Sequence, residues 1–194
     1  MTQHVINPEL PHLGGNFALG DPACFSAAAF DYCLKTFAIQ SVMDLGSGQG
    51  HTARWFLDRG CTVTAVEGLP ENVHRAVVPT TQHDLVTGAY VHPVDLTVCI
   101  EVVEHVPAEF VHNLVDTLAN GRWILLTHAV PGQRGWHHVN CQPSQYWIDL
   151  LAQRGYLLLQ EHSQKIQELA RGDRAQHIAR NGMLFEKTES HKNS

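Results

Sequence analysis

A turn with three glycines follows an apolar run near residue 41, and it is the feature that most constrains the fold of this chain. Residues 41–56 read Ser-Val-Met-Asp-Leu-Gly-Ser-Gly-Gln-Gly-His-Thr-Ala-Arg-Trp-Phe. Glycine tolerates positive φ and has no Cβ to hold a ligand away from the backbone. The helical pattern that follows offers unpaired N–H groups to an anionic ligand group. The segment therefore predicts a strand, a ligand-binding turn and a helix start within an α/β sheet.

The order Asp-Leu-Gly-Ser-Gly-Gln-Gly, from Asp44 to Gly50, resembles motif I of the class I S-adenosylmethionine (SAM) dependent methyltransferases. A dinucleotide-binding fingerprint would instead read Gly-x-Gly-x-x-Gly. The resemblance covers about residues 40–161. It implies SAM as cofactor and a Rossmann-like, seven-stranded, mostly parallel sheet with an antiparallel edge hairpin and helices on both faces. The cofactor-binding residues that we expect are Asp44, Gly46, Ser47, Gly48, Gly50, Glu67, Asp84, Leu85 and Glu101.

Two acids downstream of the turn end predicted strands and suit the two ends of an adenosine group. Glu67 follows the β-branched run 61–66, and one carboxylate can accept hydrogen bonds from both hydroxyls of a ribose. Asp84 lies in the run 81–85, where the resemblance implies contact with the adenine amino group. Each acid could instead be an ordinary loop or strand-end residue, and the sequence leaves both interpretations open.

Hydrophobic periodicity and turn residues predict the remaining elements. Helices are expected over 26–37, 71–77, 110–118, 144–154 and 165–171, and strands over 95–100, 123–127, 156–161 and 182–186. The link 86–93 is too short for a full helix, and we expect little chain between the last two strands besides one inserted helix. We divide the chain into an N-terminal arm and helix (1–39), a methyltransferase domain (40–187) and a disordered tail (188–194). The arm is either a simple tail or a lid over the cofactor.

Composition limits the classes of protein to consider. With 194 residues, 44% apolar and 16% charged, the chain fits one globular domain. The net charge of −6 disfavours a broad nucleic-acid surface, although an RNA 3′ end in a small pocket stays possible. Five cysteines without a Cys-x-x-Cys pair favour free thiols in the cytoplasm, and no apolar run is long enough to span a membrane. Oligomeric state is left open.

A second group of polar residues follows the apolar run 95–100. Glu101, Glu104 and His105 would share one face if a helical turn began near Ile100. Two carboxylates at that separation repel unless a proton or a cation lies between them. With the imidazole they would offer a site for Mg²⁺ or Mn²⁺ with open positions for substrate hydroxyls. The alternative is that the three residues only support the cofactor pocket.

The loop 128–141 supplies further histidines beside this group. The strands before Glu101 and before the loop are expected to be neighbours, so His137 or His138 could complete the site. The Glu-Val-Val-Glu-His run with a later histidine resembles the metal-dependent small-RNA 3′-terminal 2′-O-methyltransferases. Within that resemblance, the spacing to Tyr146 favours His137. The run also resembles the ubiquinone-pathway O-methyltransferases.

These resemblances imply divalent-metal-assisted O-methylation of a hydroxyl on a small diol-bearing substrate, which is a sugar, a catechol or a ribose end. A dication lowers the pKa of a bound hydroxyl, and an imidazole can then accept the proton. Two alternatives stay open: a metal-free small-molecule N-, O- or C-methyltransferase, and a non-catalytic SAM-binding partner subunit. The expected metal ligands are Glu101, Glu104, His105 and His137, and the catalytic candidates are His137, His138 and His105, with His128 as a further possible base.

Overall fold

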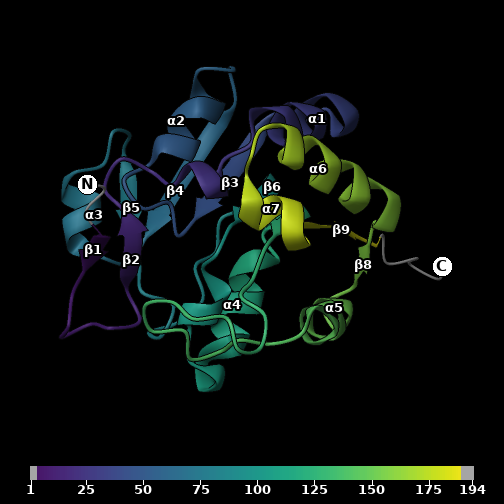
Figure 1. The fold of residues 1–194 in the computed structure, drawn as a ribbon. Coiled ribbons are helices and arrows are strands. Elements are labelled where there is room, and N and C mark those ends of the chain that lie inside the picture. Colours follow the sequence, from purple (N-terminus) through teal and green to yellow (C-terminus); the bar gives the residue numbers. More distant parts are fainter. Residues whose placement is uncertain (1–3, 189–194) are drawn as a thin grey trace.

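The computed structural model describes residues 4–188 and is built on one seven-stranded sheet (Figure 1). The strand order is β5-β4-β3-β6-β7-β9-β8, with β5 through β7 parallel and β9 antiparallel to both of its neighbours. This confirms the predicted mostly parallel sheet with an antiparallel edge. The strands are β3 (Ser41–Leu45), β4 (Thr62–Glu67), β5 (Thr80–Gln82), β6 (Val94–Cys99), β7 (Gly121–Leu126), β8 (Tyr156–Leu158) and β9 (Met183–Lys187).

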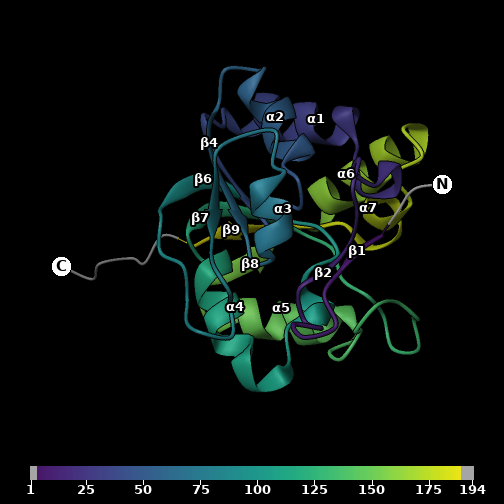
Figure 2. The same cartoon turned by 90° about the vertical axis from the view of Figure 1, so that its left-hand side faces the viewer.

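Helices cover both faces of the sheet, as predicted (Figure 2). One face carries α1, α6 and α7, whose core includes Phe30 and Ile178. The opposite face carries α4 and α5, whose core includes Leu114 and Trp147. The helices are α1 (Ala27–Phe37), α2 (His51–Leu57), α3 (Pro70–His74), α4 (Val111–Leu118), α5 (Ser144–Ala152), α6 (Gln160–Gly172) and α7 (Gln176–Asn181), with the 3-10 turns η1 (Pro22–Cys24), η2 (Val103–His105) and η3 (Ala108–Phe110).

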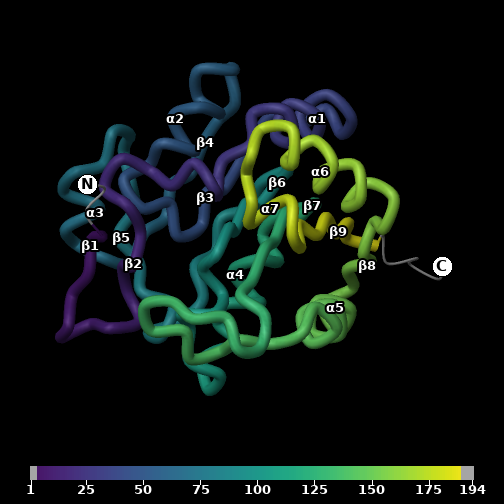
Figure 3. The backbone as a smooth tube through the Cα atoms, in the orientation of Figure 1, coloured from purple at the N-terminus to yellow at the C-terminus, as the bar shows by residue number. Residues whose placement is uncertain are grey.

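The N-terminal segment, residues 4–24, is more ordered than the irregular arm that the sequence predicts. Strands β1 (His4–Ile6) and β2 (Gly14–Phe17) pair antiparallel, and η1 follows them. The tube in Figure 3 shows the segment crossing from the side of β5 to α7, which η1 contacts. Side chains then cap the next two elements: Asp21 accepts from Ala23 N, and Ser26 accepts from Ala29 N at the start of α1. The path places this segment over the carboxyl ends of the central strands.

The connection between β8 and β9 differs from the prediction. It holds two helices where the sequence suggested one short helix over 165–171. Gln160 already begins α6, so β8 ends at Leu158 and the expected strand over 156–161 is shorter. The apolar spacing of Ile166 and Ala170, both buried, drives the longer helix against α1. The second helix, α7, returns the chain toward the carboxyl ends of the strands.

Other boundaries follow the sequence more closely. In the described chain no helix forms over 83–93, as expected, and the helix predicted over 71–77 ends earlier, at His74. Apart from Thr188, the expected tail 188–194 lies outside the described residues. Each helix within residues 4–188 is too short or too polar to cross a bilayer.

Candidate active site

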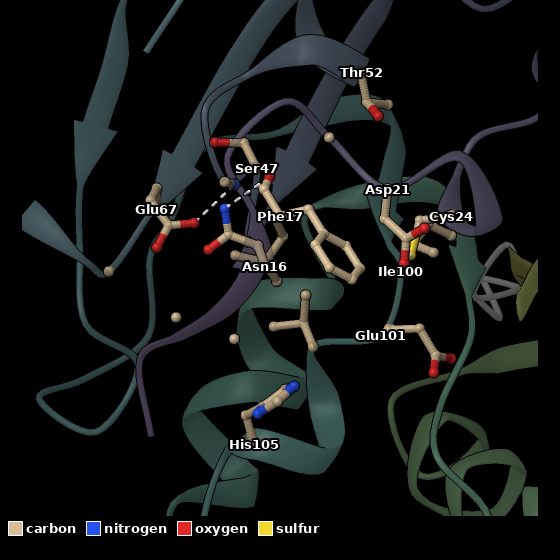
Figure 4. Close-up of a pocket in the computed structure, with 18 of the residues that line it drawn as sticks. Asn16, Phe17, Asp21, Cys24, Ser47, Thr52, Glu67, Ile100, Glu101 and His105 are labelled. Carbon is tan, nitrogen blue, oxygen red and sulfur yellow. Dashed lines mark hydrogen bonds between the residues drawn. The ribbon is translucent and has the colours of Figure 1, made fainter. Parts of the chain in front are cut away.

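A cavity of about 790 Å³ lies at the carboxyl ends of β3, β4 and β6. Its wall comes from the glycine turn, the N-terminal segment, residues 100–102, 104–106, 133–136 and 138, and His177 of α7. Figure 4 shows Glu67 and Ser47 on one side of it, Asp21 and Cys24 on the other, and Glu101 below them. The cavity thus joins most of the predicted cofactor residues with Glu101, Glu104, His105 and His138 in one space, whereas Gly50 and His137 do not line it.

The glycine turn has the positive φ angles that its sequence allows. Gly46 has a φ of +69°, and a Cβ there would overlap the Val102 side chain. Gly48 has a φ of +55°, and its N–H donates to Oε2 of Glu67 at 2.8 Å. Gly50 lies behind the turn, where it precedes α2 with a φ of +81° and packs against Val78. Gly46 and Gly48 therefore bring the backbone to the cavity, whereas Gly50 serves the packing of the turn.

Glu67 is held in a fixed orientation at the end of β4. It is buried, and its Oε1 accepts a hydrogen bond from Leu69 N at 2.8 Å while Oε2 accepts from Gly48 N. Burial raises the pKa of this carboxyl, and the backbone donors act against that rise. Each oxygen keeps a further lone pair, so the carboxylate can still accept two hydroxyl donors from a ribose.

Asp44 and Asp84, two further acids of the predicted cofactor set, differ in their partners. Asp44 is buried with no hydrogen-bond partner for Oδ2 among residues 4–188, and burial raises its pKa to about 7. Asp84 accepts from Val86 N through Oδ1, and its Oδ2 lies 3.0 Å from Nε2 of His12. The N-terminal segment thus contacts the predicted adenine-binding acid, while Asp44 keeps one oxygen for a ligand. Leu85, beside Asp84, is nearly buried in the cavity wall.

The N-terminal segment contributes a residue that the sequence analysis missed. Asn16 and Asn72 exchange side-chain amide hydrogen bonds of 3.3 and 2.8 Å, and the Asn16 amide lies against Gly48. Phe17, next in sequence, points into the cavity (Figure 4). No local pattern could have identified Asn16, because its partner is distant in the chain and belongs to another element.

Glu101 does not share a helical face with Glu104 and His105, which corrects the prediction. It has a φ of +53°, and the helical turn η2 begins only at Val103. Its Oε1 accepts from the Thr127 hydroxyl at 2.9 Å, and its Oε2 accepts from the Gln133 amide at 3.2 Å and lies 2.9 Å from Nδ1 of His177. Burial opposes ionisation, but the contacts with His177, Thr127 and Gln133 lower the pKa of the carboxyl.

Glu104, His105 and His138 form a group whose ligating atoms all lie within 4.8 Å of one another. Glu104 is fully buried, and neither of its oxygens has a hydrogen-bond partner in the described chain. Burial, and then the charge of Glu101, raise the pKa of Glu104 well above its ordinary value. Burial also lowers the pKa of His105 to about 4, helped by His138 and His137, so this imidazole is neutral at pH 7.

The structure brings His138, and not His137, to the other predicted ligands. A Cβ on Gly135 would overlap the His138 ring, so the glycine allows the close approach. His138 Nδ1 lies 3.2 Å from the Gln133 carbonyl oxygen, and the ring lies against Gly135. His137 has a φ of +45° and lies near His12, whose charge, after burial, lowers its pKa. The two adjacent histidines therefore differ in position, which their spacing to Tyr146 does not reveal.

His128 is engaged in structural contacts. It is buried, with Nδ1 3.1 Å from the Ala129 carbonyl oxygen and Nε2 3.0 Å from the Ser144 hydroxyl at the start of α5. Its pKa is lowered by burial. These contacts tie the loop after β7 to α5 and do not place the imidazole among the cavity residues.

A second group, which the sequence analysis missed, consists of Asp21, Cys24 and His177. Their ligating atoms also lie within 4.8 Å of one another. Burial, and then the charges of Asp21 and Glu101, raise the pKa of the Cys24 thiol. The separation of Asp21 and Cys24 by three positions is a local signal, but His177 comes from α7, an element that the sequence did not predict.

Comparison with protein families decides the class. A family model described as a methyltransferase domain matches residues 23–189. The chain belongs to this methyltransferase family. It is a SAM-dependent methyltransferase, as the glycine turn predicted. No curated protein sequence matches the chain.

Solved structures share the fold of this methyltransferase. The sugar N-methyltransferase KedS8 from Streptoalloteichus sp. has a TM-score of 0.61 at 13% identity, over 84% of this chain and 88% of that one. The O-methyltransferase from a trans-AT PKS multienzyme of Brevibacillus brevis, in complex with S-adenosyl-L-homocysteine, has a TM-score of 0.56 at 17% identity, over 81% and 69%. The methyltransferase domain of bacterial CtHen1 has a TM-score of 0.53 at 17% identity, over 66% and 84%.

The residues of the cavity fit SAM, which supplies an electrophilic methyl group on a sulfonium. The turn at Gly46 and Gly48 lets a ligand approach the backbone, because no Cβ projects there. Glu67 is oriented by two backbone N–H groups, and Asp44 presents a buried oxygen that needs a partner. The chain's own contribution to methyl transfer is alignment of donor and acceptor within one cavity.

Proposed function

We propose that this methyltransferase catalyses divalent-metal-assisted O-methylation of a hydroxyl on a small diol-bearing acceptor, such as a sugar, a catechol or a ribose end. The observation that carries the proposal is the buried carboxylate of Glu104, which lacks a hydrogen-bond partner in residues 4–188 and lies beside two imidazoles. A buried charge of this kind is costly unless a cation or a proton compensates it. The group faces the same cavity as the glycine turn.

Of the two cations expected, Mg²⁺ and Mn²⁺, the donor set favours Mn²⁺, because two of its three donors are imidazoles and Mg²⁺ prefers oxygen ligands. Glu104, His105 and His138 are the residues that would hold it, and one carboxylate with two imidazoles matches sites that keep open positions. When bound, a dication would lower the pKa of an acceptor hydroxyl. The negative charge of nearby Glu101, which already raises the pKa of Glu104, adds to the attraction for a cation.

The chain's own groups have separate tasks in this proposal. In the metal-assisted reaction His138 and neutral His105 would both serve as ligands, whereas in the metal-free alternative either imidazole could accept the acceptor's proton. The N-terminal segment acts as a lid that excludes water: it contacts Asp84 through His12 and covers the glycine turn with Asn16. Two oxygens of a vicinal pair suit the adjacent open positions of one cation.

Calorimetric titration of Mn²⁺ into chelator-treated protein, with and without S-adenosyl-L-homocysteine, tests the proposal. We expect saturable one-site binding in the wild-type protein. Affinity should fall by at least about 100-fold in Glu104→Gln and in His138→Ala, more than changes to outer-shell partners cost. His137→Ala, a change at the adjacent residue outside the group, should bind Mn²⁺ like the wild type. Circular dichroism would check that each variant is folded.

Two outcomes would overturn the metal assignment. Absence of Mn²⁺ and Mg²⁺ binding in both cofactor states would leave a metal-free N-, O- or C-methyltransferase. Loss of binding in His137→Ala but not in His138→Ala would restore the ligand set that the sequence spacing favours. Cofactor binding without methyl transfer to any diol or amine in an acceptor screen would favour a non-catalytic partner subunit.

A further inference from the structure

We infer that Asp21, Cys24 and His177 form a second metal site, suited to Zn²⁺, that ties the N-terminal segment to α7. The three side chains line the cavity, and they come from opposite ends of the described chain. Figure 4 shows Asp21 and Cys24 projecting together into the same part of the pocket, above Glu101. The inference does not depend on the site at Glu104.

The separations between the ligating atoms suit a tetrahedral zinc ion. Cys24 Sγ lies 3.7 Å from Asp21 Oδ2, and His177 Nε2 lies 3.8 Å from the same oxygen. A tetrahedron built from zinc bonds of about 2.0–2.3 Å has edges of roughly 3.4–3.6 Å between such ligands. These two separations lie within a few tenths of an ångström of those edges, and the third pair of ligating atoms, from Cys24 and His177, lies within 4.8 Å.

The local fold explains how Asp21 and Cys24 come to share one side. Asp21 caps the 3-10 turn η1, and Cys24 is its last residue. In a 3-10 helix, side chains three positions apart eclipse each other. Oδ1 of Asp21 accepts from Ala23 N, which orients the carboxylate and leaves Oδ2 on the side of Cys24 and His177.

Glu101 supplies an independent indication of a metal ligand. Its Oε2 lies 2.9 Å from Nδ1 of His177, while Nε2 of the same ring faces Asp21. Histidines that bind metals commonly donate their other N–H to a carboxylate, which fixes the tautomer and the ring orientation. Glu101 itself is fixed by Thr127 and Gln133, so a carboxylate lies where a metal-bound His177 would donate its second N–H.

The chemistry of the ligands separates this site from the first one. A thiolate, an imidazole and a carboxylate form a borderline-soft set that suits Zn²⁺, whereas Mg²⁺ prefers oxygen ligands. Three protein ligands leave a fourth tetrahedral position, and it would face the cavity that all three line. A zinc ion here would hold η1 against α7 and thereby keep the N-terminal segment over the cofactor turn.

Titration of Co²⁺ into the chelator-treated full chain reports on this site directly, because only a thiolate ligand gives an intense sulfur-to-cobalt charge-transfer band. We expect one equivalent of Co²⁺ to produce the band in the wild-type protein, and Zn²⁺ to displace it. Cys24→Ser should abolish the band, and His177→Gln should weaken Co²⁺ binding at this site by at least about 10-fold. Cys141→Ser, a change to the other half-buried cysteine, should keep the band.

The variant Glu104→Gln is the control for the proposed site at Glu104, and it should also keep the charge-transfer band. The two proposals can therefore fail independently. Limited proteolysis supplies a second readout: Zn²⁺ should slow cleavage within residues 4–20 in the wild type but not in folded His177→Gln. The absence of a charge-transfer band in the wild type, or a band that survives Cys24→Ser, would overturn the site. Zinc binding that leaves the cleavage rate unchanged would overturn the proposal that the ion holds the N-terminal segment against α7.

Discussion

The two ends of the cavity are built in different ways. The cofactor end, residues 44–50, 67 and 84–85, comes mostly from the ends of three adjacent strands and is oriented by backbone hydrogen bonds. The acceptor end, residues 21–24, 101–105, 133–138 and 177, joins four distant segments and is rich in titratable side chains. Local backbone geometry determines the structure of the cofactor end, whereas contacts between segments distant in sequence determine that of the acceptor end.

Two buried glutamates show what this difference means. Glu67 at the cofactor end accepts hydrogen bonds from Gly48 N and Leu69 N, whereas Glu104 at the acceptor end has no such partner within residues 4–188. A buried carboxylate without donors must bind a cation or keep its proton. The cofactor end is therefore pre-organised by the fold itself, and the acceptor end requires a bound charge to be stable in its ionised form.

Asp44 is the exception at the cofactor end, and it gives the largest effect that we predict. Its pKa is about 7 in the folded chain, whereas an aspartate in an unfolded chain has a pKa of 3.8. Between these values the folded state keeps a proton that the unfolded chain releases, so this residue's contribution to stability falls as pH rises from about 4 to about 7. At about 1.4 kcal/mol per pH unit, the loss is on the order of 4 kcal/mol.

Asp44→Asn removes this titration. Urea unfolding of both proteins should be measured across that pH window. The free energy of unfolding of the variant, relative to that of the wild type, should rise with pH by the same order of magnitude. Because the other carboxyls are common to both proteins, the difference between the two curves reports mainly on Asp44. A difference in unfolding free energy that stays constant between pH 4 and pH 7 would show that Asp44 is not a costly buried carboxyl.

Gly46→Ala tests the rigidity of the turn and should cost somewhat less. A Cβ would overlap Val102 at a φ of +69°, so overpacking and left-handed strain should together destabilise the chain by about 3 kcal/mol. Gly60→Ala is the matched control, because Gly60 has a φ of +83° but open space around it, and it should cost only about 1 kcal/mol. Equal losses in chemical denaturation would mean that Val102 gives way and that the turn is less constrained than its geometry indicates.

The difference between the cofactor end and the acceptor end explains how much of the structure the sequence could predict. Strand, glycine turn and terminal acid are consecutive or nearly so, so the pattern from Asp44 to Glu67 identified the cofactor end and the fold. Apolar spacing also located α1 and α4 within a residue of their starts. These features depend on local geometry, which the sequence encodes directly.

The acceptor end depends on contacts that no spacing encodes. Choosing correctly between His137 and His138 required knowledge of the loop, in which adjacent residues differ in direction and His137 has a positive φ. Glu101 leaves the predicted helical face because of its own positive φ, which non-glycine residues rarely adopt. His177 was missed because α7 lies in a connection where one short helix was expected.

Calorimetric titration of S-adenosyl-L-homocysteine tests the central claim, that the glycine-turn end binds the cofactor independently of the acceptor end. We predict binding to the wild type, weaker binding by about 10-fold to 100-fold in Glu67→Gln, which loses a charged acceptor, and nearly unchanged binding in His138→Ala. No binding to the wild type, or an equal loss in both variants, would contradict the account.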